Sequence, residues 1–144
     1  MRRVLFVCIH NSGRSKMAEA FFNRYAGDQA IAESAGTEPG QSVNPAVVEA
    51  MRELGFDLSQ SLPRALTFEM AQGVEKVITM GCMDGCPVVN APHEDWALPD
   101  PMGKDFTEVR KIRDEIKKRV ILLLEGMGTK PISPSSKPDI SWDH

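Results

Sequence analysis

The 144-residue sequence lacks any long apolar segment, and its apolar runs stay far below the roughly 18–20 residues that a membrane-spanning helix requires. It also lacks an excess of basic residues, since 17 Lys and Arg are outnumbered by 20 Asp and Glu. A net charge of -3 argues against a general nucleic-acid-binding protein, which normally presents a basic surface. The apolar run after Arg2 and Arg3 is too short for a signal peptide. We therefore expect a cytoplasmic protein with no membrane or nucleic-acid partner.

Cysteine is also scarce, and the three cysteines make an odd number. An odd count in a chain without an export signal does not favour a framework of structural disulfides. We therefore interpret Cys8, Cys82 and Cys86 as candidates for reactive or redox-active thiols.

The remaining composition fits one folded unit. With 42% hydrophobic residues, the chain can form one domain that contains a sheet and its covering helices. We assign residues 1–127 to this domain. Residues 128–144 carry Pro131, Pro134 and Pro138 among serines, a composition that predicts a loosely ordered C-terminal tail.

Short apolar runs alternate with amphipathic segments along the chain. Residues 4–7, Val-Leu-Phe-Val, are too short for a core helix and rich in β-forming residues, which predicts a strand buried on both faces and hence a parallel sheet. Further strands are predicted at residues 30–35, at 76–80 and within 92–101. Helices are predicted from Ser15 to Gly27, from Asn44 to Gly55 and from Asp105 to Gly126, with a short helical piece at 67–72. This alternation indicates a single-domain α/β fold.

The loop between the first predicted strand and the first helix has the properties of an anion-binding site. It lies at the carboxyl end of a strand, where open α/β sheets bind ligands. Backbone N–H groups and the helix dipole hold tetrahedral oxyanions at such a position, and the guanidinium of Arg14 can bind two oxygens at once. The residues expected to bind the substrate are Ile9, His10, Asn11, Ser12, Gly13, Arg14 and Ser15.

Cys8 occupies the first position of this loop. A free thiol, with a pKa of about 8.5, is mostly protonated at neutral pH, but thiol pKa values fall to roughly 3.5–7.5 at helix N-termini. Cys8 is therefore predicted to be a thiolate nucleophile beneath the bound anion. We expect Ser15 to donate a hydrogen bond to this thiolate, Asn11 to hold the shape of the loop, and Gly13 to adopt a backbone angle that other residues resist. The alternative is a buried structural cysteine with Arg14 at the surface.

The other two cysteines, Cys82 and Cys86, follow the third predicted strand. A parallel sheet places them on the same rim as Cys8, and a helical turn between them would bring their Cα atoms within the roughly 4.4–6.8 Å of a disulfide. This arrangement suggests a relay of thiol–disulfide exchanges. Two alternatives remain open: the two cysteines are small buried residues, or they are zinc ligands together with Cys8, His10 or His93.

The run CIHNSGRSKMAEAFF, preceded by VLFV, resembles the phosphate-binding loop of the low-molecular-weight protein tyrosine phosphatase superfamily. It is more similar still to the thioredoxin-coupled arsenate reductases built on that fold. The resemblance covers residues 3–125 in motif order. It implies a single phosphatase-like domain with a four-stranded parallel sheet in the order 2-1-3-4, helices on both faces, and an arsenate or phosphate oxyanion as substrate. We expect no metal ion and no cofactor.

The resemblance also implies a general acid. Both related families carry an Asp-Pro pair before the last helix, which corresponds to Asp100-Pro101 here, and its carboxyl group protonates the departing oxygen. The phosphatases follow this pair with aromatic residues that hold a phosphotyrosine ring. Met102-Gly103 stands there in this sequence, which disfavours an aryl phosphate substrate.

For the arsenate reductases, the resemblance implies a relay of the three cysteines. Cys8 would attack arsenic, Cys82 would attack the Cys8 sulfur, and Cys86 would carry the disulfide outward to a thioredoxin-like protein or a low-molecular-weight thiol. The spacing between Cys82 and Cys86 is shorter than in some relatives, which leaves the order of the relay open. The alternative function is that of a low-molecular-weight protein tyrosine phosphatase.

Overall fold

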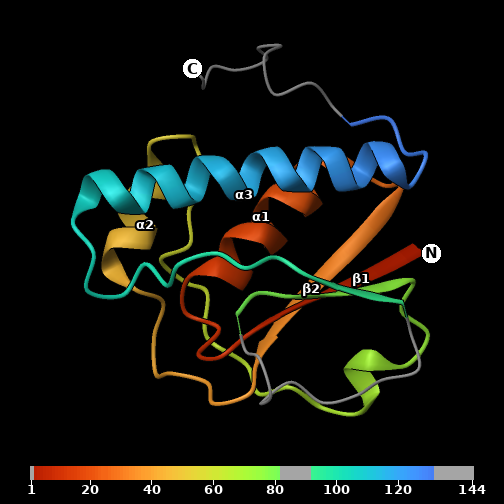
Figure 1. The fold of residues 1–144 in the computed structure, drawn as a ribbon, viewed down its shortest axis with the longest axis horizontal. Coiled ribbons are helices and arrows are strands. Elements are labelled where there is room, and N and C mark those ends of the chain that lie inside the picture. The colour runs from red at the N-terminus through yellow and green to blue at the C-terminus, as the bar shows by residue number, and fades with distance from the viewer. Residues whose placement is uncertain (1, 82–91, 132–144) are drawn as a thin grey trace.

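Four parallel strands form the centre of the structure, a computed structural model that describes residues 2–81 and 92–131 (Figure 1). Cys82, Cys86 and residues 132–144 lie outside the described residues. The sheet order is β2-β1-β3-β4, which confirms the predicted topology. The strands are β1 (Arg2–Cys8), β2 (Ala30–Gly36), β3 (Lys76–Thr79) and β4 (His93–Asp95).

Strand β1 is central and buried on both faces, as its apolar run predicts. Val4, Leu5, Phe6 and Val7 are each at most 2% exposed. The strand pairs with β2 along its whole length, up to Cys8 opposite Gly36, and with β3 up to Val7 opposite Thr79. The carboxyl ends of these three strands therefore meet at one rim, and Cys8 lies on it.

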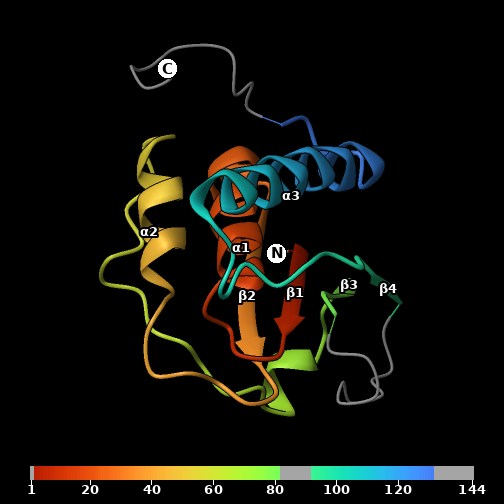
Figure 2. The ribbon, with the colours of Figure 1, turned by 60° about the vertical axis from the view of Figure 1, so that its left-hand side comes forward.

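In the described residues, three α-helices lie on one side of the sheet: α1 (Arg14–Ala26), α2 (Pro45–Arg52) and α3 (Phe106–Gly126). Figures 1 and 2 show α1 and α3 side by side over the strands, with α2 next to them. The opposite face, which carries Leu5 and Val7, packs against the segment around the short 3-10 helix η1 (Glu69–Ala71). Helices thus lie on both faces, as expected, but very unequally.

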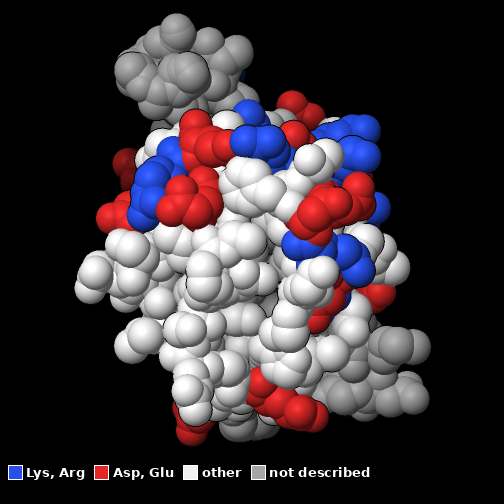
Figure 3. All heavy atoms as spheres, turned by 90° about the vertical axis from the view of Figure 1, so that its left-hand side faces the viewer, with Lys and Arg blue, Asp and Glu red and all other residues white. Residues whose placement is uncertain are grey.

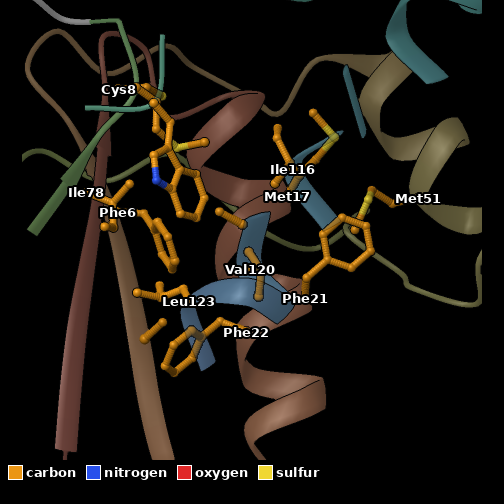
Figure 4. Close-up of a cluster of buried hydrophobic side chains, with 14 of the residues drawn as sticks. Phe6, Cys8, Met17, Phe21, Phe22, Met51, Ile78, Ile116, Val120 and Leu123 are labelled. Carbon is orange, nitrogen blue, oxygen red and sulfur yellow. The ribbon is translucent and has the colours of Figure 1, made fainter. Parts of the chain in front are cut away.

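The apolar core between the sheet and the α-helices fixes the end of β1. Phe6 lies between Phe22 and Trp96, with ring centroids 6.0 and 5.7 Å away. Figure 4 shows Cys8 at one end of this cluster, beyond Phe6 on the same strand. Close-packed cores resist even small volume changes, so the core holds the backbone that carries Cys8.

The N-terminal ends of α2 and α3 form as the sequence predicts, although α2 ends at Arg52, before the predicted end at Gly55. Asn44 accepts a hydrogen bond from the Ala46 amide with Pro45 at the first helical position, and Asp105 accepts one from the Glu108 amide.

On the face shown in Figure 3, acidic and basic side chains are interspersed. Within the described part of the chain, no helix is both long and apolar enough to cross a membrane.

The first residues of the predicted tail are attached to the domain. Thr129 donates a side-chain hydrogen bond to the Leu124 carbonyl at 2.6 Å, and Gln29 and Lys130 exchange two hydrogen bonds of 2.9 Å. The predicted boundary at residue 127 stays a prediction, because most of the tail lies outside the described residues.

Candidate active site

The loop from Cys8 to Arg14 is held by the segment that follows β2. The carbonyl oxygens of four loop residues accept backbone hydrogen bonds of 2.8–3.1 Å from this segment; the accepting residues are Cys8, Ile9, His10 and Ser12. Because these carbonyls turn outward, the loop can direct N–H groups inward, as an anion cradle requires. Helix α1 begins without a side-chain cap, so no side chain competes for its N-terminal N–H groups.

Gly36 lets the two segments approach each other. A Cβ atom at this position would lie 2.6 Å from the Ile9 carbonyl oxygen and 2.9 Å from the Asn11 amide nitrogen. The positive backbone angle of the loop belongs to Asn11, whose φ is 52°, and not to Gly13, whose φ is -148°. Gly13 is needed for space instead, since its Cβ would lie 2.9 Å from Cγ of Pro101.

A chain of hydrogen bonds ends on the buried thiol of Cys8. The Ser15 hydroxyl lies 2.9 Å from the Cys8 sulfur, and the Asn11 amide donates to the same sulfur at 3.3 Å. Asn11 Nδ2 donates to Ser15 Oγ at 2.7 Å, and Asn11 Oδ1 accepts from the Arg64 amide at 2.8 Å. Because Ser15 Oγ accepts from Asn11, its own proton is free to point at sulfur. This arrangement suits a negatively charged sulfur.

Arg14 and Asp100 are brought together at the rim. Arg14 is 5% exposed, and its Nη1 donates to the Leu98 carbonyl at 2.9 Å. Its Nη2 lies 3.6 Å from Asp100 Oδ2, while the other Asp100 oxygen accepts from the Met102 amide at 3.0 Å. The structure therefore places the predicted anion-binding guanidinium and the predicted general acid at one site.

His10 contributes to the shape of the loop. Its Nδ1 lies 3.0 Å from the Glu38 carbonyl oxygen, which can only accept, so Nδ1 carries a proton. His93 lies on the exposed strand β4, and Trp96 is buried in the core. Among the described residues, no three His, Cys, Asp or Glu side chains gather as metal ligands.

Comparison with known proteins agrees with this geometry. The family model described as low molecular weight phosphotyrosine protein phosphatase matches residues 3–132. The chain belongs to this family. It is 38% identical over 121 residues to arsenate reductase 1 of Staphylococcus epidermidis, an alignment that covers 81% of this chain and 90% of the relative.

Solved structures of family members have the same fold. A thioredoxin-dependent arsenate reductase of Corynebacterium glutamicum has a TM-score of 0.77 and 35% identity, covering 89% of this chain but only 62% of that longer chain. An arsenate reductase in the phosphate binding state has a TM-score of 0.75 and 33% identity, covering 88% of this chain and 98% of that chain.

Gly81, the last described residue before Cys82, lies next to Arg14. Strand β3 ends at the level of Cys8, and the Met80 amide donates to the Val7 carbonyl at 2.8 Å. Gly81 follows with a φ of +84°, and a Cβ there would lie 2.5 Å from Arg14 Nη1. The predicted positions of Cys82 and Cys86 themselves lie outside the described residues.

Sequence reasoning missed the two glycines that shape this site. The sequence pattern does not indicate the contacts of Gly36 and Gly81, because each meets a residue far away in the sequence. It also missed the contact between Leu98 and Arg14, which are 84 positions apart. A glycine directly after a predicted strand at the ligand-binding rim was the available signal.

Proposed function

We propose that the protein reduces arsenate to arsenite, with Cys8 as the nucleophile. The observation that carries this proposal is the position of the Cys8 sulfur at the N-terminus of α1. The Asn11 amide donates a hydrogen bond to this sulfur, and the Ser15 hydroxyl lies within hydrogen-bond distance of it. Its relatives with substantial identity include proteins named as arsenate reductases. Arsenate and phosphate are both tetrahedral oxyanions, so one cradle of N–H groups with Arg14 fits either.

In the first step, the Cys8 thiolate attacks As(V) and one oxygen leaves as water. The substrate-binding residues Ile9 to Ser15 would hold the remaining oxygens through their amides and through the Arg14 guanidinium. Asp100, 3.6 Å from Arg14, would give a proton to the departing oxygen. The product of this step is a covalent bond between Cys8 sulfur and arsenic.

In the second step, the Cys82 thiolate attacks the Cys8 sulfur. A disulfide forms, the sulfur–arsenic bond breaks, and its electron pair remains on arsenic, which leaves as arsenite, As(III). Cys86 then attacks the Cys82 sulfur and releases the Cys8 thiolate. A thioredoxin-like protein or a low-molecular-weight thiol would reduce the Cys82–Cys86 disulfide and return both cysteines to thiols.

Thiol counting tests the relay directly. The reduced protein should lose two thiols on a single addition of arsenate, and mass mapping should locate the new disulfide. Cys82→Ser should abolish repeated turnover, and Cys8→Ser should abolish the first step. Unchanged turnover in Cys82→Ser would rule out the relay.

The family description favours phosphatase activity as a second candidate function. A phosphatase transfers phosphorus without reducing it, so it has no use for Cys82 and Cys86. Hydrolysis of p-nitrophenyl phosphate should then survive the loss of both cysteines, require Cys8, and exceed any arsenate activity. Met102 is 55% exposed beside Asp100 and offers no aromatic ring for phosphotyrosine, which favours arsenate reduction.

We also propose that residues 1–127 form the catalytic domain, that residues 128–144 form a tail outside it, and that the protein acts in the cytoplasm. The proposed relay depends on thiols, which a reducing compartment maintains. A chain truncated after residue 131 keeps the contacts of Thr129 and Lys130 and should keep full arsenate reductase activity. Cell fractionation tests the location.

A further inference from the structure

Lys16 is a buried ammonium group in the first turn of α1. Its side chain is only 4% exposed. Burial disfavours the charged form of an amine, and it lowers the pKa of Lys16 from its ordinary value. An apolar side chain such as methionine would avoid this desolvation. A charged residue at this position therefore suggests a task beyond packing.

The counterion of Lys16 is shared with a second cation. Glu19 Oε1 lies 3.8 Å from the Lys16 ammonium, which is too far for a hydrogen bond. The same oxygen accepts from the Ser34 hydroxyl at 2.6 Å, and Glu19 Oε2 accepts from Arg64 Nη2 at 2.8 Å. Two cations thus share one carboxylate, and the group formed by Lys16, Glu19, Ser34 and Arg64, here called the Lys16 cluster, has a formal charge of +1.

The Lys16 cluster lies behind the catalytic loop. Lys16 directly follows Ser15, whose hydroxyl contacts the Cys8 sulfur, and the Arg64 amide binds the Asn11 side chain of the loop. A Cys8 thiolate lies within electrostatic range of the Lys16 ammonium and favours its charged form. Lys16 thus lies next to the groups that contact the Cys8 sulfur, and Arg64 binds the side chain of Asn11, whose amide donates to that sulfur.

The charged groups that face Lys16 come from three elements. Glu19 belongs to α1 itself, Arg64 to the segment before η1, and Cys8 to the end of β1. Lys16, Glu19 and Arg64 line an open pocket of about 570 Å³, and Asp57 lies on its wall. Arg14 is directed elsewhere, toward the Leu98 carbonyl and Asp100.

We propose that Lys16 is a positioning residue that stabilises the Cys8 thiolate from behind the loop, while Arg14 remains available for the oxyanion. The inference rests on the nucleophilic role of Cys8 in the proposed function, and it does not depend on which oxyanion is the substrate. The formal charge of +1 on the Lys16 cluster then has a function, because a positive charge near the sulfur supplements the dipole of α1.

Alkylation of Cys8 by iodoacetamide tests the proposal in a chain that carries Cys82→Ser and Cys86→Ser, where Cys8 is the one thiol left. In this background, Lys16→Met should shift the pH profile of the alkylation rate to higher pH and slow the reaction at pH 7 roughly fivefold. Lys16→Arg should retain most of the rate. Lys118→Met, at an exposed position on α3, is the matched control and should change nothing.

Glu19→Gln tests the proposal in the opposite direction, because it makes the Lys16 cluster more positive. It raises the formal charge of the Lys16 cluster from +1 to +2, so the alkylation profile should shift to lower pH. If Lys16→Met and Glu19→Gln lower the melting temperature but leave the profile in place, Lys16 has only a structural role and the proposal is wrong. Should Lys16→Met not fold, Lys16→Gln takes its place with the same expected shift. Failure of the unsubstituted protein to reduce arsenate would refute the proposed function without affecting this test.

Discussion

Gly81 is the position where one added methyl group should disturb the site most directly. Its φ is +84°, and a Cβ atom would lie 2.5 Å from Arg14 Nη1, well inside contact distance. Gly81→Ala must therefore displace the Arg14 guanidinium, which also donates to the Leu98 carbonyl at 2.9 Å. Gly128 has a similar φ of +78° with no atom within 4 Å of its Cβ position, so Gly128→Ala is a matched control for backbone strain.

The expected magnitudes separate the two variants. A left-handed conformation costs an alanine about 1–2 kcal/mol, and this term applies to both. Only Gly81→Ala also loses the hydrogen bond from charged Arg14, which contributes about 1.5–3 kcal/mol. We expect the free energy of unfolding to fall by about 1–2 kcal/mol in Gly128→Ala and by about 2.5–5 kcal/mol in Gly81→Ala.

Urea unfolding measures these differences, and calorimetric titration with phosphate measures the second effect. A displaced Arg14 cannot bind two oxygens of the anion, so the phosphate affinity of Gly81→Ala should fall about tenfold or more, while that of Gly128→Ala should not change. If the two variants have equal stability and equal phosphate affinity, the inferred contact between Gly81 and Arg14 is wrong.

Three further substitutions address the thiol, an ion pair and the core. Ser15→Ala removes a hydrogen bond to the Cys8 sulfur and should lower kcat/KM for arsenate about 10- to 100-fold, whereas exposed Ser42→Ala should not; equal values would contradict the hydrogen-bond chain. Hydrogen bonds from Arg110 and Arg113 lower the pKa of Glu53 from 4.5 to about 2. The Glu53 carboxylate therefore stabilises the fold at pH values above 4.5, and this stabilisation is lost as the pH falls toward 2. Glu53→Gln should therefore lower the melting temperature at pH 7 but not at pH 2, and an equal deficit at both would refute this linkage. The buried Tyr25 hydroxyl has no hydrogen-bond partner in the described part of the chain, so Tyr25→Phe should leave stability in urea unchanged or raise it by up to about 1 kcal/mol; a clear loss would show a missed partner.

The sequence allowed the fold and the loop to be predicted because both depend on local patterns. A short apolar run predicted the buried strand β1, and Asn44 and Asp105 predicted the starts of α2 and α3. Cys8 and Ser15 are seven positions apart, at the two ends of one strand-to-helix loop, so their contact follows from the course of that loop. The one-sided packing of the α-helices was not predictable in the same way, because both faces of β1 are apolar.

The surroundings of the loop depend on residues from distant parts of the chain. Asn11 is 53 positions from Arg64, and Arg14 is 84 positions from Leu98, so no spacing pattern connects them. In the sequence, a glycine that leaves room for a neighbouring backbone or side chain also looks like a glycine that only permits a turn. Gly36 and Gly81 are of the first kind, whereas Gly103 and Gly128 have positive φ angles and open space.

Whether a glycine has a close neighbour or open space determines whether a substitution there can alter the proposed reaction. The identity of Cys8 and Arg14 indicates what reaction the loop can perform, but the position of the Arg14 guanidinium is set by Leu98, Asp100 and Gly81, which belong to two other segments. Gly81 lies against the Arg14 guanidinium, and it also directly precedes Cys82, the second cysteine of the proposed relay. Substitutions at Gly81 therefore act on the anion site through space and on the relay through the backbone, which a substitution at Gly128 cannot do.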